Sequence, residues 1–139
     1  MPVTVRILHD HGLVVVRYDG EATIEGTLAA LTGAAADPAF AASRRHLIDM
    51  RDVTGYERDF ARFFAMQAQF ADHVPARAGD LLAVYIAPGR PAQEMAQMAA
   101  RTWDGHTDVA IRIVADSGDA GDLLGLAPGL VEALLATPG

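Results

Sequence analysis

The sequence predicts one α/β domain built on a mixed, mainly parallel sheet of four to five strands. Short apolar segments rich in Val, Ile and Leu alternate with longer segments whose apolar residues recur at helical spacing. A short turn joins the first two apolar segments, which indicates an antiparallel hairpin at one edge. The later strands alternate with helices, and crossover connections of this kind favour parallel pairing. No linker rich in Pro, Gly or Ser divides residues 1–139, so we expect a single domain.

The hairpin is predicted at residues 3–8 and 13–18. Residues 3–8 alternate apolar and polar side chains, which is the period of a half-buried strand. The turn between the strands contains His9 and His11. An ordinary turn is favoured over a metal site, because no third ligand lies nearby in the sequence. Residues 19–20, an Asp-Gly pair, are expected to end the second strand.

The first helix is predicted over residues 24–35, with Thr23 as its N-cap. Its apolar residues recur at helical spacing, at Ile24, Leu28 and Leu31. The Asp-Pro pair at 37–38 ends this helix, because proline cannot continue the backbone hydrogen bonds and constrains the residue before it. Phe40 is expected to fold back into the core.

The stretch 46–64 is the segment around which the rest of the chain is organised. It predicts a buried strand at 47–50, a charged loop at 51–55 and a helix over 57–73. Asp49 interrupts the apolar strand, and its side chain is expected to accept backbone amides of the following turn. The alternative is a general base or a ligand at the strand end. Binding and catalytic sites in α/β proteins gather where strands end and the following helices begin. Residues 49–59 are therefore the first place to look for a functional site.

The second half of the chain repeats the alternation of strand and helix. Residues 80–86 form the most continuous apolar strand, as expected for one buried on both faces. A helix over 91–103 places Met95 and Met98 on one face. Arg90 in the preceding loop could hold an anion, although an ordinary helix start is favoured.

Three further elements follow. A strand is predicted at 108–114, then a short helix at 119–124 capped by Ser117. Pro128 starts a last helix that runs to residue 136, and its apolar face needs a surface to cover. That helix either packs on the domain or forms a contact with a second copy. The order is therefore ββαβαβαβα with an extra C-terminal helix.

Composition excludes several classes of protein. The 139 residues carry a formal charge of −7, so the chain should repel nucleic acid. Cysteine is absent, which excludes disulfides and thiol catalysis. Neither a signal peptide nor an apolar run long enough to span a membrane is present, so we expect a cytoplasmic protein. All basic residues are Arg, which with abundant Ala and Gly suggests a bacterial chain.

No catalytic signature is present, and we expect neither an enzyme nor a bound cofactor or metal. The two serines, Ser43 and Ser117, lie outside any nucleophile elbow. His46 and Asp49 are the nearest candidates for a catalytic pair, but strand alternation points them to different faces.

The order of elements resembles the SpoIIAA-like branch of the STAS superfamily. The resemblance covers nearly the whole chain up to residue 126. The motifs that carry it are Gly20-Glu21, Asp37-Pro38-Ala39-Phe40, Leu47-Ile48-Asp49-Met50-Arg51-Asp52-Val53-Thr54, Ala87-Pro88, Met95-Ala96-Gln97-Met98 and Ala120-Gly121-Asp122-Leu123-Leu124-Gly125-Leu126. The resemblance implies a small regulatory module. Anti-sigma-factor antagonists of the superfamily switch by phosphorylation of a serine where a helix opens. The matching turn here, residues 56–59, has no hydroxyl at that position, and Thr54 is the nearest substitute.

Two functions follow as hypotheses. In the first, the protein is a non-enzymatic regulatory module that meets an unidentified protein partner through alternating charges, namely Arg51, Asp52, Thr54, Glu57, Arg58, Asp59 and Arg62. In the second, which the fold similarity of this branch to CRAL-TRIO lipid-binding domains implies, it carries or senses a small apolar, lipid-like ligand. The residues that would line the pocket are Phe60, Phe63, Phe64, Met95 and Met98. Phe70 continues the same helix, and packing against the sheet is the simpler explanation for this aromatic stripe. A homodimer is left open.

Overall fold

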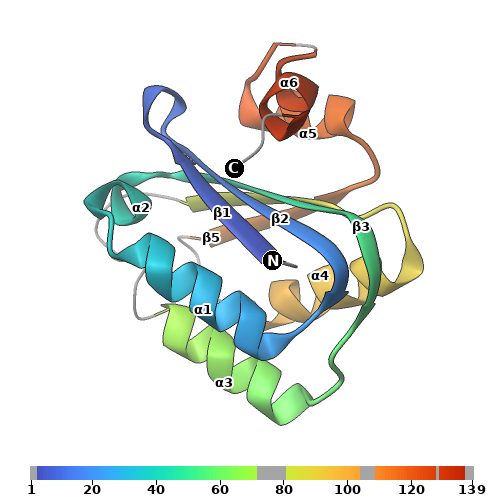
Figure 1. Ribbon diagram of the computed structural model, residues 1–139. Helices are drawn as coiled ribbons and strands as arrows, with labels where there is room; N and C mark the ends of the chain where they lie inside the picture. The colour runs from blue at the N-terminus through green and yellow to red at the C-terminus, as the bar shows by residue number, and fades with distance from the viewer. Residues whose placement is uncertain (1–2, 72–80, 104–108, 128, 137–139) are drawn as a thin grey trace.

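The computed structural model describes residues 3–71, 81–103, 109–127 and 129–136. The strands pair in the order β1-β2-β3-β4-β5 to form one five-stranded sheet (Figure 1). Their bounds are Val3–Leu8 for β1, Leu13–Ala22 for β2, Arg45–Tyr56 for β3, Leu81–Ile86 for β4 and Val109–Val114 for β5. β1 runs antiparallel to β2, and the other three pairings are parallel. The predicted mixed, mainly parallel sheet is confirmed.

Helices cover both faces of the sheet. Their bounds are Ile24–Ala35 for α1, Pro38–Ala42 for α2, Phe60–Ala71 for α3, Arg90–Thr102 for α4, Ser117–Leu124 for α5 and Leu130–Ala136 for α6. In Figure 1, α1, α3 and α4 lie on one side of the sheet, and α5 and α6 lie on the other. Among the described helices, none combines the length and the apolar character that a membrane crossing requires.

β3 is central and alternates its side chains between two separate cores. Ile48 and Met50 enter the core under α1, α3 and α4, whereas Leu47 enters the core under α5 and α6. The last helix contributes Val131 and Leu135 to that second core. Of the two alternatives for α6, packing on the domain is therefore the one observed.

The charged loop expected at 51–55 is wrong, because β3 continues through it to Tyr56. The second strand also passes Asp19 and Gly20, where it was expected to end, and reaches Ala22. The register of the β2–β3 ladder shifts twice along this extension. Gly20 has φ of 81°, a left-handed conformation that glycine adopts without steric cost. The Asp-Gly pair therefore bends a long strand instead of ending a short one.

The helix after β3 starts later than predicted, at Phe60, because the Asp59 carboxylate accepts from the Arg62 amide as an N-cap residue does. The end of the predicted helix, residues 72–73, lies outside the described residues, as do residues 80, 108 and Pro128. α5 is capped by Asp116, whose carboxylate accepts from the Asp119 amide at 2.8 Å, and not by Ser117. A carboxylate at the N-cap also complements the helix dipole.

The other local predictions agree with the structure. Thr23 caps α1 by accepting from the Gly26 amide at 3.1 Å. Asp37 and Pro38 open the short helix α2, which carries Phe40 into the core. His9 and His11 lie in a single 3-10 turn between the hairpin strands.

Candidate interaction surface and internal pocket

The charged residues predicted to meet a partner follow the last part of β3 and the start of α3. We call Arg51, Asp52, Thr54, Glu57, Arg58, Asp59 and Arg62 the rim. All of them are exposed except Glu57, which is half-buried. In Figure 1, β3 continues past its pairing with β4, alongside the bent end of β2, before the chain turns into α3.

Glu57 and Asp59 fix the end of the rim that adjoins α3. The Glu57 carboxylate accepts from the Ile24 amide at 3.2 Å and pairs with Arg62 at 3.1 Å. It therefore links the rim to the first turn of α1. The Asp59 carboxylate accepts from the Arg62 amide at 3.1 Å, as an N-cap residue does, so it holds the start of α3.

Arg58 belongs to a cluster that joins the rim to α4. Its guanidinium lies 4.7 Å from the centre of the Tyr56 ring and 3.7 Å from the Glu94 carboxylate. The Tyr56 hydroxyl donates to Glu94 at 2.8 Å. Desolvation, followed by the hydrogen bond to Glu94, raises the pKa of Tyr56. The neutral phenol therefore remains the donor at neutral pH.

The far end of the rim faces α6, and its side chains form hydrogen bonds and ion pairs with other residues of the same chain. Asp49 is 1% exposed and accepts from the amide and the guanidinium of Arg51, at 3.0 to 3.1 Å. The Arg51 guanidinium also reaches Glu132 of α6 at 2.5 Å, and Arg17 pairs with Asp52 at 3.2 Å. Hydrogen bonding to Asp49 raises the pKa of Arg51.

Asp49 thus has the structural role favoured from the sequence, although the amide it accepts from lies in a strand and not in a turn. His46 lies on the opposite face of β3, where its ring is 5.5 Å from that of Phe40. Burial, with a smaller contribution from Arg44, lowers the pKa of His46 to about 4. The two residues do not form a catalytic pair, as strand alternation predicted.

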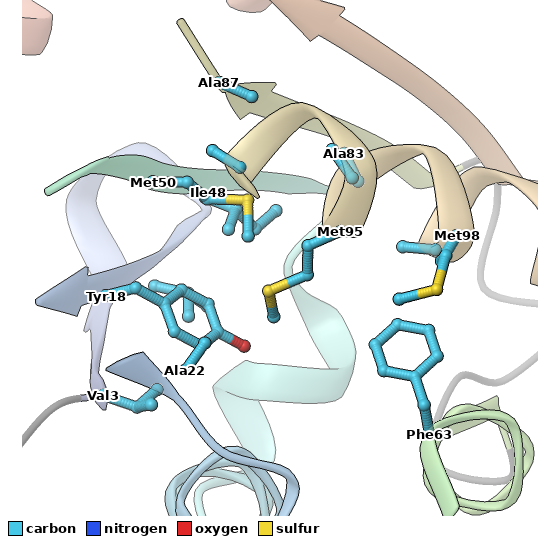
Figure 2. Packing of buried hydrophobic residues seen from close by; sticks show 14 of the residues in the cluster. Val3, Tyr18, Ala22, Ile48, Met50, Phe63, Ala83, Ala87, Met95 and Met98 are labelled. Atoms are coloured by element: carbon cyan, nitrogen blue, oxygen red, sulfur yellow. The ribbon is translucent and has the colours of Figure 1, made fainter. Parts of the chain in front are cut away.

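A small pocket lies between the sheet and helices α1, α3 and α4. Its volume is about 60 Å³, and its walls include Val16 and Tyr18 of β2, Ile48 of β3, Phe63 of α3 and Met95 of α4. In Figure 2 the side chains of Tyr18 and Met95 point toward one another between the strands and the helices. Pockets that hold drug-sized ligands have volumes of about 300–1,000 Å³. A lipid-sized molecule therefore does not fit in this pocket.

The aromatic stripe of α3 is divided between the interior and the solvent. Phe63 is 3% exposed, whereas Phe60 and Phe64 are 47% and 42% exposed. The explanation by packing against the sheet is therefore wrong for Phe60 and Phe64. Helical geometry explains the division, because residues four apart share a face and α3 presents only the Phe63 face to the core that it shares with α1 and α4. The side chain of Phe70 lies outside the described residues.

The predicted ligand-binding residues are divided in the same way. Phe63 and Met95 line the internal pocket. Phe60 and Met98 line a separate hollow on the surface, together with Tyr56, Arg58 and Arg101. Phe64 lines neither. Sequence reasoning did not assign His46 or Tyr85 to a pocket, and both line the internal pocket. The available signal was that Tyr18 and Tyr85 interrupt apolar strands as polar-tipped side chains.

The strand order, the antiparallel edge hairpin and the two helical layers define an α/β domain with a SpoIIAA-like STAS fold. Four chains of solved structures match this one, among them the anti-sigma factor antagonist SpoIIAA in its unphosphorylated form. That match has a TM-score of 0.50 at 11% sequence identity and covers 97% of this chain and 99% of SpoIIAA. The fold resemblance predicted from the sequence is confirmed. No protein-family model and no curated protein matches the chain.

Proposed function

We propose that this protein is a non-enzymatic regulatory module of the bacterial cytoplasm that binds a protein partner through the rim. The observation that carries the proposal is the exposure of Phe60 and Phe64, two large aromatic side chains beside the charges of the rim. Exposed aromatic residues with arginines nearby are characteristic of protein interfaces, where such side chains supply much of the binding energy. We call Phe60 and Phe64 the aromatic patch.

The arrangement of charges around the aromatic patch supports the same proposal. Arg58 is held by the Tyr56 ring and by Glu94, and Arg62 is held by Glu57. Arginines fixed in this way lose less conformational freedom when they bind, which favours association. The partner surface is proposed to centre on residues 58–64, because the exposed rings of Phe60 and Phe64 lie there, whereas Arg51 and Asp52 lie at the end of the rim that faces α6.

The fold comparison supports a regulatory role for such a surface. SpoIIAA, whose fold this chain shares, is an anti-sigma factor antagonist, and an antagonist of this kind acts on another protein. The proposal for this chain does not depend on a phosphorylated serine. The side chain at the N-cap of α3 is the carboxylate of Asp59, which already accepts from the Arg62 amide.

A pull-down with matched surface variants tests the proposal. Phe64→Glu places a charge in the aromatic patch, and Leu123→Glu places one on α5, across the sheet. The two side chains are equally exposed, at 42%. We expect Phe64→Glu to lose a specific partner that the parent protein and Leu123→Glu both retain. If all three proteins capture the same partners in the same amounts, the proposal is wrong.

A further inference from the structure

The surface hollow beside Phe60 is bounded by two parts of the chain that are far apart in the sequence. One wall comes from the end of β3 and the start of α3, and the other comes from α4. The lining residues are Tyr56, Arg58, Phe60, Glu94, Gln97, Met98 and Arg101. We call this space the α3–α4 hollow. Its volume is about 250 Å³, a size that suits side chains projecting from a partner.

The α3–α4 hollow has an apolar part that adjoins the aromatic patch. Phe60 belongs to both, and almost half of its side chain is exposed. Met98 lies buried beside it, and methionine adapts to contacts of irregular shape. A bulky apolar side chain that entered the hollow would cover the exposed part of the Phe60 ring, and contacts of this kind contribute much of the binding energy at protein interfaces.

Arginine outnumbers acid around the α3–α4 hollow. Among the described residues that line it, Glu94 is the one acid. Its carboxylate accepts from the Tyr56 hydroxyl at 2.8 Å and also pairs with Arg58 at 3.7 Å and Arg90 at 3.4 Å. One carboxylate does not balance two guanidinium groups, and the exposed Arg101 adds a third. Arg101 forms no hydrogen bond or ion pair within the part of the chain that the structure describes.

The other acids near the start of α3 do not remove this excess. Glu57 pairs with Arg62, and the Asp59 carboxylate holds the first turn of α3. Neither acid lines the α3–α4 hollow. The hollow is thus locally positive in a chain whose formal charge is −7. Complementary charge selects partners and orients them, so the hollow favours an anionic group.

We propose that the α3–α4 hollow binds a segment of the partner protein in which an Asp or Glu adjoins a bulky apolar residue. The apolar side chain contacts Phe60 and Met98, and the carboxylate pairs with Arg101. A carboxylate is favoured over a phosphate group, because Glu94 repels a dianion more strongly than a single negative charge. The hollow adjoins the aromatic patch, so this inference rests on the proposed function and adds the chemistry of the partner.

Selection from a library of random peptides displayed on phage tests the proposal. The parent protein is immobilised, and an excess of soluble Arg101→Glu protein removes peptides that bind elsewhere on the surface. We expect the enriched peptides to carry Asp or Glu next to Phe, Trp or Leu. Enrichment of peptides that lack this pair, or no enrichment at all, would overturn the proposal.

A synthetic copy of the most enriched peptide measures the charged contact. Arg101→Gln should weaken its binding about three- to ten-fold, a value between that of an exposed ion pair and that of a buried hydrogen bond to a charged group. Arg112→Gln is the control, because Arg112 is also exposed but lies on β5, outside the hollow. It should bind the peptide as the parent does. An equal affinity of the parent and Arg101→Gln would contradict the proposal.

A double-mutant cycle identifies the group that Arg101 meets. Replacing the acid of the peptide by its amide should weaken binding to the parent and have a clearly smaller effect on Arg101→Gln. Equal effects on both proteins would mean that the acid does not pair with Arg101. Adenosine monophosphate, which combines an aromatic ring with a phosphate group, is the competitor of a different class. It should not displace the peptide at equal concentration, and displacement would overturn the preference for a carboxylate.

The same pull-down that tests the proposed function separates its failure from the failure of this inference. A partner that Phe64→Glu loses and Arg101→Glu retains would support the proposed function and overturn the assignment of the α3–α4 hollow. A partner that both variants lose supports both. If no captured protein depends on Phe64 although the peptides bind as expected, the proposed function is wrong and the peptide specificity of the hollow is supported.

Discussion

On one face of the sheet, α1, α3 and α4 cover a core that includes methionine, alanine and aromatic side chains and leaves a small pocket. On the other face, α5 and α6 cover a core of Leu, Val, Ile and Ala, and arginines also bond to their ends. Arg45 donates to the Leu124 carbonyl at the end of α5, at 2.5 Å. Arg6 donates to the Leu134 carbonyl of α6, and Arg17 donates to the Leu135 carbonyl at 3.0 Å. These carbonyls are among those that a helix C-terminus leaves without an intrahelical partner.

From this difference we expect the face under α1, α3 and α4 to be more adaptable than the face under α5 and α6. Arginines near the helix ends satisfy the free carbonyls and complement the helix dipoles, which holds α5 and α6 in one position. The face under α1, α3 and α4 depends on apolar packing with flexible methionines, which tolerate small displacements. The aromatic patch and the part of the rim that adjoins α3 lie at the edge of this adaptable face.

The largest expected effect comes from truncating one buried side chain of β3 in each of the two cores, at Leu47 and at Met50. Leu47→Ala should cost about 4 kcal/mol, because the core under α5 and α6 has little freedom to close around the cavity. Met50→Ala, next to the pocket, should cost about 2–3 kcal/mol, because Met95 can move into the space. Urea unfolding of both variants measures the two costs. Equal costs would contradict the difference in adaptability.

Removal of the buried carboxylate should have the next largest effect. Asp49→Ala removes the buried acceptor of the Arg51 hydrogen bonds and the longer ion pair with Arg17 at 3.9 Å. It should cost about 2–3 kcal/mol, since hydrogen bonds to charged groups contribute about 1.5–3 kcal/mol. The arginines keep access to water, which limits the cost. Urea unfolding gives the value, and Asp52→Ala at the exposed end of the same cluster is the control. A cost below that of the control would show that Asp49 does not hold this face together.

The buried His46 predicts that the stability of the protein depends on pH. This residue lies on the face of the sheet that α1, α3 and α4 cover. The pKa of His46 is about 4 in the folded protein, below the value of 6.5 in the unfolded chain, so the unfolded state takes up the proton first as the pH falls. The contribution of His46 to stability is therefore unaltered above about pH 7 and is lost between about pH 6.5 and pH 4.

Between pH 7 and pH 5 this loss should be about 2 kcal/mol. Unfolding of the parent and of His46→Phe at both pH values isolates it, because all other titrating groups are shared. The parent should lose more stability than the variant. An identical pH dependence in the two proteins would mean that His46 takes up its proton in the folded state as readily as in the unfolded chain.

The smallest effect is expected at the exposed ion pair between α6 and β3. Glu132→Gln should cost about 0.5 kcal/mol or less, because the side chain is exposed and the remaining hydrogen bonds of Arg51 to Asp49 persist. The cost should decrease further at high salt. A loss of several kcal/mol would mean that this pair, and not Asp49 with the arginines, fastens α6.

The sequence predicted the elements whose local signals agree with their environment. Thr23 before an amphipathic run predicts the start of α1, and the continuous apolar run of β4 predicts a strand buried on both faces. The extension of β3 was missed because Arg51 and Asp52 place two opposite charges directly after the apolar run, which is also typical of a loop. Only pairing with the bent end of β2 makes this segment a strand, and that pairing depends on the left-handed Gly20.

The candidate site was predictable in part. The position and exposure of the rim follow from its alternating charges at a strand end. The division of the aromatic stripe was not predictable, because Phe60, Phe63 and Phe64 have the same chemistry and only the placement of α3 decides which ring is buried. The pocket brings together Tyr18, His46 and Tyr85 from three strands, and no local pattern links residues so far apart in sequence.

Site-specific photocrosslinking in living cells tests the proposed interaction surface most directly. A benzophenone amino acid placed at Phe64, and in a second protein at Leu123, samples two equally exposed positions on opposite sides of the sheet. We expect a discrete crosslinked adduct with another protein from position 64 and none from position 123. Adducts from position 123 alone, or none from either position, would contradict the proposal that the aromatic patch and the rim are the binding surface.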